Sequence, residues 1–190
     1  MQSGQTFLII GAFVLLSTMT LNVNSALIGT STTGLEMEAT LDAMSIGQTL
    51  LDEILTQDFD QKTLGGIRVY STDSLTTPAK FGPDGTAETI SGNKGIDTSS
   101  TDNFQSLTRF NDVDDYNGYT RMSWNPRFGW FTLAVHIDYV NEDNPYVLLT
   151  TQSFYKRVSV TVTHPNLGKD LKNNVIPVTL QDLAVYRRFF

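Results

Sequence analysis

Four side chains with carboxylate or amide oxygens lie within six residues in the middle of the chain. They are the carboxylates of Asp112, Asp114 and Asp115 and the amide of Asn117. Carboxylate and amide oxygens bind Ca²⁺ in proteins at about 2.3 to 2.6 Å, so these four residues are candidate calcium ligands. Their spacing is not that of an EF-hand, which needs Gly at its sixth position and Glu at its twelfth. The alternative is a solvated turn in which these side chains accept local backbone hydrogen bonds.

The residue types that enzymes use most often are scarce in this chain. His136 and His164 are the only histidines, and there is no cysteine. The sequence contains no G-x-S-x-G nucleophile motif, no phosphate-binding loop and no dinucleotide fingerprint. Strand-like alternation places His136 beside Asp138 on a polar face, where we expect a surface histidine. We therefore expect no enzyme and no small-molecule substrate, although two carboxylates could still converge in space for glycoside chemistry.

Aromatic side chains suggest a further kind of site. Trp124, Trp130, Tyr116 and Tyr119 flank a predicted strand, and such rings can form a platform that stacks on sugars. Aromatic residues beside a strand also serve as core. Both interpretations stay open at the level of sequence.

Composition limits the classes of protein to consider. The chain has 190 residues, enough for one ordinary domain and an appendage. Its net charge of −7 repels phosphate backbones, so we expect no nucleic-acid partner. Without cysteines, a secreted domain would have no disulfides and would depend on packing.

The N-terminal segment is apolar and uncharged. The first charged side chain is Glu36, and residues 7–21 read FLIIGAFVLLSTMTL. A cleaved signal peptide usually starts with Lys or Arg, whereas this chain starts MQSGQ. A membrane anchor and a helix buried among copies of itself are the other two interpretations. For the last of these, the packing residues would be Phe7, Leu8, Ile9, Ile10, Phe13, Val14, Leu15, Leu16, Met19 and Leu21.

Two further segments complete a predicted N-terminal stalk over residues 1–58. Residues 22–34 are rich in Asn, Ser, Thr and Gly, which favour helix weakly, so we expect this stretch to be extended or frayed. Thr33 and Glu36 have capping-box spacing, which predicts that a second helix starts there and runs to about Asp58. Its predicted apolar stripe, with an acidic remainder that includes Glu53, comprises Met37, Leu41, Met44, Leu51 and Leu55.

Residues 59–190 predict a β-rich globular head. Residues 61–102 contain only scattered apolar residues, such as Ile67, Val69 and Tyr70, and read as mostly loop with one or two short strands. Period-two alternation then predicts strands over 131–139 and 154–163, with further strands at 146–149 and 175–185. Consecutive strands with short connections favour an antiparallel sheet, and a helix on one face gives an α+β fold.

The order of these segments resembles type IV pilins and the pseudopilins of type II secretion. Three strings, NDVDDYNGY at 111–119, YKRVSVTVTHP at 155–165 and VTLQDLAVYRRFF at 178–190, look like segments of minor pilins of the mannose-sensitive haemagglutinin type. Pilins carry a Glu as fifth residue, where this chain has Gln5. The resemblance implies that Gln5 makes the N-terminal polar contact to a neighbouring subunit, by hydrogen bonding instead of charge pairing.

The sequence therefore predicts a structural subunit of a bacterial extracellular filament, which polymerises through its apolar N-terminal helix. Its partners would be copies of itself, and the inner membrane before assembly. No cofactor is required by this reading, apart from the candidate Ca²⁺. A membrane-anchored monomeric binding protein, or a minor tip adhesin, is the first alternative, and an extracellular enzyme is the second.

Overall fold

The computed structural model describes residues 2–90, 96–97 and 104–187. The chain forms two compact units, which divide between Glu38 and Ala39. The division lies inside the first helix, so helix residues from Ala39 onward belong to the head unit. The predicted α+β fold, with a long N-terminal helix and an antiparallel sheet, is confirmed.

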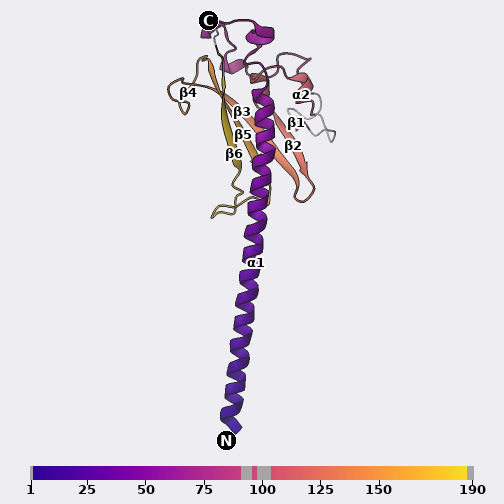
Figure 1. Ribbon diagram of the computed structural model, residues 1–190, viewed down its shortest axis with the longest axis vertical. Coiled ribbons are helices and arrows are strands. Elements are labelled where there is room, and N and C mark those ends of the chain that lie inside the picture. Colours follow the sequence, from indigo (N-terminus) through magenta and orange to yellow (C-terminus); the bar gives the residue numbers. More distant parts are fainter. Residues whose placement is uncertain (1, 91–95, 98–103, 188–190) are drawn as a thin grey trace. The chain divides into compact units, whose positions relative to one another are not determined.

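Helix α1 runs without interruption from Gln2 to Leu55 (Figure 1). The expectation that residues 22–34 are extended or frayed is therefore wrong, as is the expected second helix start at Thr33. Threonine hydroxyls in this stretch bond back to the preceding turn, as Thr30 does to the carbonyl of Leu27 at 3.0 Å and Thr32 to that of Ile28 at 2.6 Å. Because helix propagation is far easier than nucleation, and no proline precedes Pro78, weak propensity alone does not break the helix.

The buried stripe of α1 differs from the predicted one. Met37 and Leu41 are 65% and 66% exposed, and Met44 is also exposed, while Leu51 is buried as expected and Leu55 is half-buried. The first three buried positions along the helix are occupied by small residues. The buried positions on α1 are Ala39, Ala43, Gly47, Leu50, Leu51 and Ile54.

Close approach between helix and sheet explains this choice. A Cβ atom added at Gly47 would lie 2.5 Å from Cδ1 of Leu180 and 3.0 Å from Cγ2 of Val162. Only a residue without a side chain fits such a gap unless its neighbours move. The prediction followed the bulkiest apolar residues, but the packed face begins with the small residues Ala39, Ala43 and Gly47 and only then continues with Leu50, Leu51 and Ile54.

The head contains a six-stranded sheet in the order β1-β2-β3-β5-β6, with the short β4 paired to β3. All of its pairs are antiparallel except β1 with β2, which is parallel. The predicted strands at 131–139, 146–149, 154–163 and 175–185 are each confirmed in part or whole, whereas β2 was missed. Strand β1 is a short strand within residues 61–102, as expected. The strands are β1 (Ile96–Asp97), β2 (Thr120–Asn125), β3 (Gly129–Val140), β4 (Leu148–Leu149), β5 (Tyr155–Thr163) and β6 (Val178–Val185).

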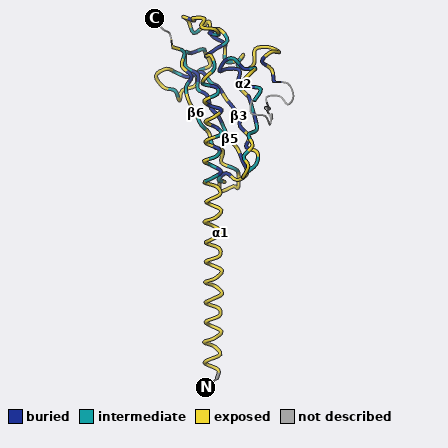
Figure 2. The backbone as a smooth tube through the Cα atoms, turned by 45° about the vertical axis from the view of Figure 1, so that its right-hand side comes forward, coloured by how far each residue is buried: buried dark blue, intermediate teal, exposed yellow. Residues whose placement is uncertain are grey.

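One face of this sheet forms the core. Strand β3 alternates buried and exposed residues along most of its length, as its period-two sequence predicts. The part of α1 from Ala39 onward lies over the face formed by β3, β5 and β6 (Figure 1). Figure 2 shows that burial along α1 is confined to this part of the helix.

The chain between α1 and β2 is mostly loop, as expected. The part of the predicted loop at 91–95 and 98–102 lies outside the described residues. The loop contains short helical turns that hold it against the core. They are η1 (Gln61–Gly66), η2 (Thr72–Ser74), η3 (Pro78–Lys80), α2 (Ser106–Arg109) and η4 (Asp114–Tyr116).

Candidate functional site

The residues predicted to pack in a filament core all lie on the exposed part of α1. Each of the ten is at least 53% exposed, and the apolar surface continues through Val23, Leu27 and Ile28. Gln5 lies in the first turns of the helix and is exposed. The residues are Phe7, Leu8, Ile9, Ile10, Phe13, Val14, Leu15, Leu16, Met19 and Leu21.

This helix has the length and composition to cross a membrane, and none of its most apolar stretch is buried. Exposed apolar surface on this scale is unfavourable in water, and extended patches mark contact with protein or lipid. The helix is therefore the first candidate functional surface of the chain.

The Asp-rich segment is a second candidate, and it lies inside the head. Asp112, Asp114 and Asp115 are buried, and Asn117 is half-buried. The segment is held beside the end of α1, because Val113 donates its backbone N–H to the carbonyl of Asp58 at 2.9 Å. The expectation that this turn is solvated is therefore wrong, because its three Asp side chains are buried.

Local hydrogen bonds do account for part of the segment. Asp115 Oδ2 accepts the backbone N–H groups of Asn111 at 2.9 Å and Asp112 at 3.3 Å. Asn117 Oδ1 accepts the backbone N–H of Ile137 on β3 at 3.1 Å. The amide of Asn117 thus serves to attach the segment to the sheet.

Lys156 is the residue that organises this site. It lies on β5 with its side chain fully buried, and its Nζ donates to Asp114 Oδ1 at 2.5 Å, to Asp60 Oδ2 at 3.1 Å and to the carbonyl of Phe59 at 2.6 Å. Three aromatic rings enclose the same ammonium group. The rings of Phe59, Phe81 and Tyr139 have their centroids 4.5, 5.2 and 5.4 Å from Nζ.

The sequence analysis overlooked Lys156, although a signal for it exists. Val158, Val160 and Val162 alternate on the core face of β5, and one further step back along the strand falls on Lys156. A lysine at an inward position of a strand requires a buried partner of opposite charge. The Asp-rich segment is the nearest supply of such partners in the chain.

Asp60 is a firmly held carboxylate. It caps η1 by accepting the N–H of Lys62 at 3.1 Å, and it also accepts the N–H and the hydroxyl of Thr76, each at 3.0 Å, and the hydroxyl of Tyr139 at 3.3 Å. Burial acts to raise its pKa, but the charge of Lys156 and the hydrogen bonds from Lys156 and from the backbone N–H groups of Lys62 and Thr76 outweigh burial, so the pKa of Asp60 lies below its usual value.

The carboxyls of the Asp-rich segment are shifted in the opposite direction. Burial, with the charges of Asp114 and Asp115, raises the pKa of Asp112 to about 9. Burial also raises the pKa of Asp115 to about 6, against the hydrogen bonds that its carboxylate accepts. For Asp114, burial raises the pKa and the charge of Lys156 opposes it. No donor reaches the buried Asp112 Oδ2 among the described residues. Two carboxylates cannot hydrogen-bond each other, so the bond between Asp112 and Asp114 requires a proton on one of them, and the raised pKa of Asp112 favours a proton there.

Within the described part of the chain, no three acidic, histidine or cysteine side chains converge in a way that could hold a metal ion. The ammonium group of Lys156 is the cation that lies between Asp60 and Asp114. Calcium binding by the Asp-rich segment stays a prediction that calorimetry with Ca²⁺ would test.

A second buried ion pair attaches α1 to the sheet. Arg121 on β2 contacts Glu53 at 2.7 Å, and Glu53 also accepts the hydroxyls of Ser106 at 2.8 Å and Tyr116 at 2.9 Å. The guanidinium group of Arg121 stacks 4.0 Å from the ring centroid of Phe104. Glu53 was expected in the acidic remainder outside the apolar stripe, but its side chain is buried at the contact between helix and sheet.

The four aromatic residues of the proposed sugar platform do not share one surface. Tyr116 and Tyr119 are buried and pack edge-on against Phe110. Trp124 and Trp130 are 58% and 41% exposed and meet edge to face at 5.2 Å. The tyrosines are core residues, and the tryptophans form a separate exposed pair.

The histidines have the surroundings of structural residues. His136 lies on the exposed face of β3 with Nε2 3.1 Å from Asp138 Oδ1, as predicted for a surface histidine. His164 is buried and stacks on the ring of Phe131, with Nε2 2.9 Å from the carbonyl of Phe128.

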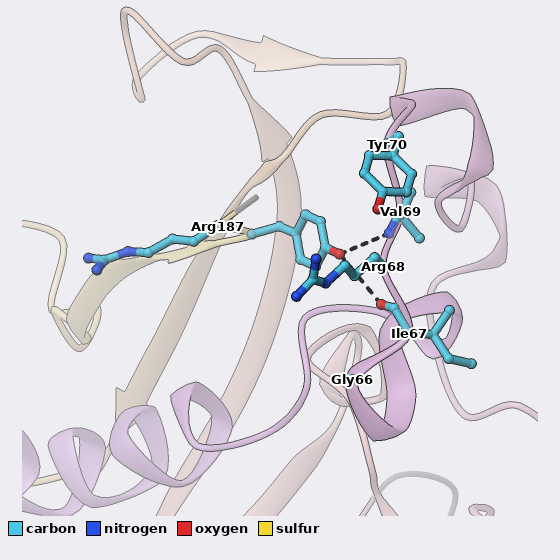
Figure 3. A pocket seen from close by; sticks show the side chains of 7 residues that line it. Gly66, Ile67, Arg68, Val69, Tyr70 and Arg187 are labelled. Atoms are coloured by element: carbon cyan, nitrogen blue, oxygen red, sulfur yellow. Dashed lines mark hydrogen bonds between the residues drawn. The ribbon is translucent and has the colours of Figure 1, made fainter. Parts of the chain in front are cut away.

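A surface pocket of about 290 Å³ lies where the C-terminal end of the described chain passes residues 66–70. Tyr186 is among its lining residues and holds two of the others, since its hydroxyl accepts the N–H of Val69 at 2.9 Å and donates to the carbonyl of Ile67 at 3.5 Å. Dashed lines in Figure 3 mark these two hydrogen bonds. Arg68 and Arg187 supply its charges, and the guanidinium of Arg187 extends away from it (Figure 3). Its described lining residues include no carboxylate that could serve as a general acid or base.

Comparison of the chain with protein-family models, with curated proteins and with solved structures returned no match. The arrangement of a long apolar N-terminal helix before an antiparallel sheet is compatible with a pilin-like fold. Arguments about function therefore depend on the exposed apolar helix and on the buried Asp-rich segment themselves.

Proposed function

We propose that this chain is a structural subunit of an extracellular helical filament of the type IV pilin kind, polymerising through the apolar part of α1. The observation that carries the proposal is the exposed helix surface that is uncharged from Ser3 to Leu35. Each Leu, Ile or Phe that becomes fully buried contributes about 1.5 to 3 kcal/mol. Several such residues per subunit would offset the entropy lost on association.

The apolar part of this surface has a length that suits either kind of neighbour. A helix rises about 1.5 Å per residue, so the apolar residues 7–28 extend about 33 Å, close to the roughly 30 Å hydrocarbon core of a bilayer, while residues 3–35 extend about 50 Å. A membrane would cover the apolar residues and leave much of the uncharged, polar stretch after them outside the hydrocarbon. Packing against parallel copies of the same helix would cover the whole uncharged segment, and contacts that repeat without closing generate a helical polymer.

The exposed apolar residues beyond Glu36 fit the same proposal. Met37, Leu41 and Met44 lie on exposed faces of α1, outside the small-residue stripe that packs on the sheet. In a filament these side chains would extend the shared apolar core beyond residues 7–28. The subunit would wait in the inner membrane before assembly, since the same helix suits lipid during that step.

A pair of leucine substitutions tests the proposal. Leu15→Asp should abolish filaments, because a carboxylate would be buried without a partner in the packed helices. Leu171→Asp is the matched control, since Leu171 is fully exposed on the head, and it should leave filaments unchanged. Normal filaments from Leu15→Asp would contradict the proposal, and circular dichroism of both variants in detergent would check that the head is folded.

A further inference from the structure

Lys156 and Asp114 bring together an amine and a carboxyl group, the two groups from which an amide bond forms. Nζ of Lys156 lies 2.5 Å from Asp114 Oδ1, and both side chains are almost fully buried. We propose that Lys156 and Asp114 condense to form an intramolecular isopeptide bond that links β5 to η4. This inference does not depend on the filament, and it concerns a part of the chain that the proposed function does not use.

The positions of the two groups favour the condensation, because the fold holds them in contact. The two groups come from residues 42 positions apart, and the fold holds them in contact without substrate binding or diffusion. Reacting groups held in this way behave as if at effective concentrations of about 10⁵ to 10⁸ M. A condensation that is unfavourable between free molecules in water then becomes accessible.

Burial favours the product. An ammonium and a carboxylate removed from water each lose several kcal/mol of hydration, and an amide carries neither charge. The rings of Phe59, Phe81 and Tyr139 surround Nζ, so they would exclude the water needed for the reverse reaction. The surroundings of the pair therefore favour the uncharged amide over the ammonium and carboxylate.

Asp114 is the electrophile and Asp60 the proton acceptor. Asp60 is held as a carboxylate by Lys62, Thr76 and Tyr139, which makes its carbon a poor target for attack. Among the described residues, no comparable set of donors reaches Asp114. Asp60 Oδ2 lies 3.1 Å from Nζ, within reach of a proton on that nitrogen.

The step balances without an outside reagent. The ammonium of Lys156 transfers one proton to the Asp114 carboxylate, and the nitrogen lone pair forms a bond to Cγ. Asp60 takes a second proton from the nitrogen and returns it to the departing hydroxyl, which leaves as water. One ammonium and one carboxylate become one amide and one water molecule, with no change of oxidation state.

The link would do for this head what disulfides do elsewhere. The chain has no cysteine. An amide between η4 and β5 would close the loop that contains β2, β3 and β4, of which β3 is the middle strand in the sheet order. Such a closure restricts the unfolded chain and cannot be removed by reducing agents.

Intact-mass spectrometry of the denatured full-length chain tests the proposal directly. We expect a mass lower than the sequence mass by that of one water molecule, in essentially all molecules. The full sequence mass would overturn the proposal without any variant being made. Lys156→Met and Asp114→Ala should each restore the full mass, whereas Lys172→Met, at an exposed position, should still show the loss.

Peptide mapping then locates the bond. Trypsin cuts after Arg109 and Arg121 and cannot cut at a modified Lys156, so residues 110–121 should be recovered joined to residues 128–157. Loss of water that persists in Lys156→Met, as from a cyclised aspartate, would overturn the proposal. A link from Lys156 to the peptide that contains Asp60 would overturn the choice of Asp114.

Discussion

At the scale of single residues, the head is organised by buried charges that interact in two groups. Lys156 is surrounded by Asp60, Asp114 and three aromatic rings, and Arg121 is held by Glu53 and Phe104. Buried ion pairs add little net stability compared with apolar packing, but removal of one partner leaves an uncompensated charge. These residues should therefore be sensitive to substitution in a way that exposed charges are not.

Arg121→Met should destabilise the head strongly. The substitution leaves Glu53 buried beside two hydroxyls with no cation, which typically costs about 3 to 5 kcal/mol. Urea denaturation of the full chain in detergent would measure the change in the free energy of unfolding. Arg68→Met is the control, because Arg68 is exposed and should change stability by less than about 0.5 kcal/mol. Equal effects of the two substitutions would contradict a structural role for the pair.

Asp115 should make the head more stable at acidic pH. Its pKa is about 6 in the folded head and near 3.8 when unfolded, so the folded state binds the proton more tightly. The resulting stability is complete below about pH 4 and is lost as the pH rises through about 6, by about 1 to 3 kcal/mol. Asp115→Asn keeps an acceptor for the N–H groups of Asn111 and Asp112 but cannot titrate. Urea denaturation between these pH values should show a shallower loss for the variant, and an unchanged slope would count against the shift.

At the scale of elements, the close contact between α1 and the sheet depends on Gly47. Gly47→Val should destabilise the head by about 1 to 3 kcal/mol, because its side chain would overlap Leu180 and Val162. Gly34→Val is the matched control, since nothing lies within 4 Å of a Cβ atom there and both positions are in the same helix. Thermal unfolding followed by near-UV circular dichroism would compare the two variants. Equal melting temperatures would show that the sheet can move away from the helix.

Periodicity predicted the strands well because the sheet has one buried face. The alternation of Phe131 to Tyr139 gave β3, and the valines of β5 gave its core face. The same reasoning failed for α1, where large Met37 and Leu41 point outward and small Ala39 and Ala43 point inward. The distance between helix and sheet decides which face of the helix packs inward, and that distance cannot be derived from a single sequence.

The site was recovered only in part for a similar reason. The Asp-rich segment was identified from residue types, but its partner Lys156 is separated from it along the chain by β2, β3 and β4. Strand alternation could have placed Lys156 on an inward face, yet the pairing of β3 with β5 was needed to bring it to Asp114. Propensity also underestimated residues 22–34, whose helix is continued by the well-formed turns on either side.

At the scale of the whole molecule, the chain combines an exposed apolar helix with a head that has a core of its own. An apolar surface of this length has to be covered, and the proposal is that copies of the same helix cover it. The head unit begins at Ala39 and does not use residues 2–38 in its core. Loss of assembly and loss of folding should therefore be separable by substitution, as the Leu15→Asp and Arg121→Met variants would show.

Negative-stain electron microscopy of material sheared from the native cell surface tests the central claim most directly, with mass spectrometry to identify the chain in what is seen. The account predicts thin fibres of uniform width that contain this chain with its apolar N-terminal helix intact. Dispersed single particles that are released only by detergent would contradict it, and would make the helix a membrane span that carries a monomeric head.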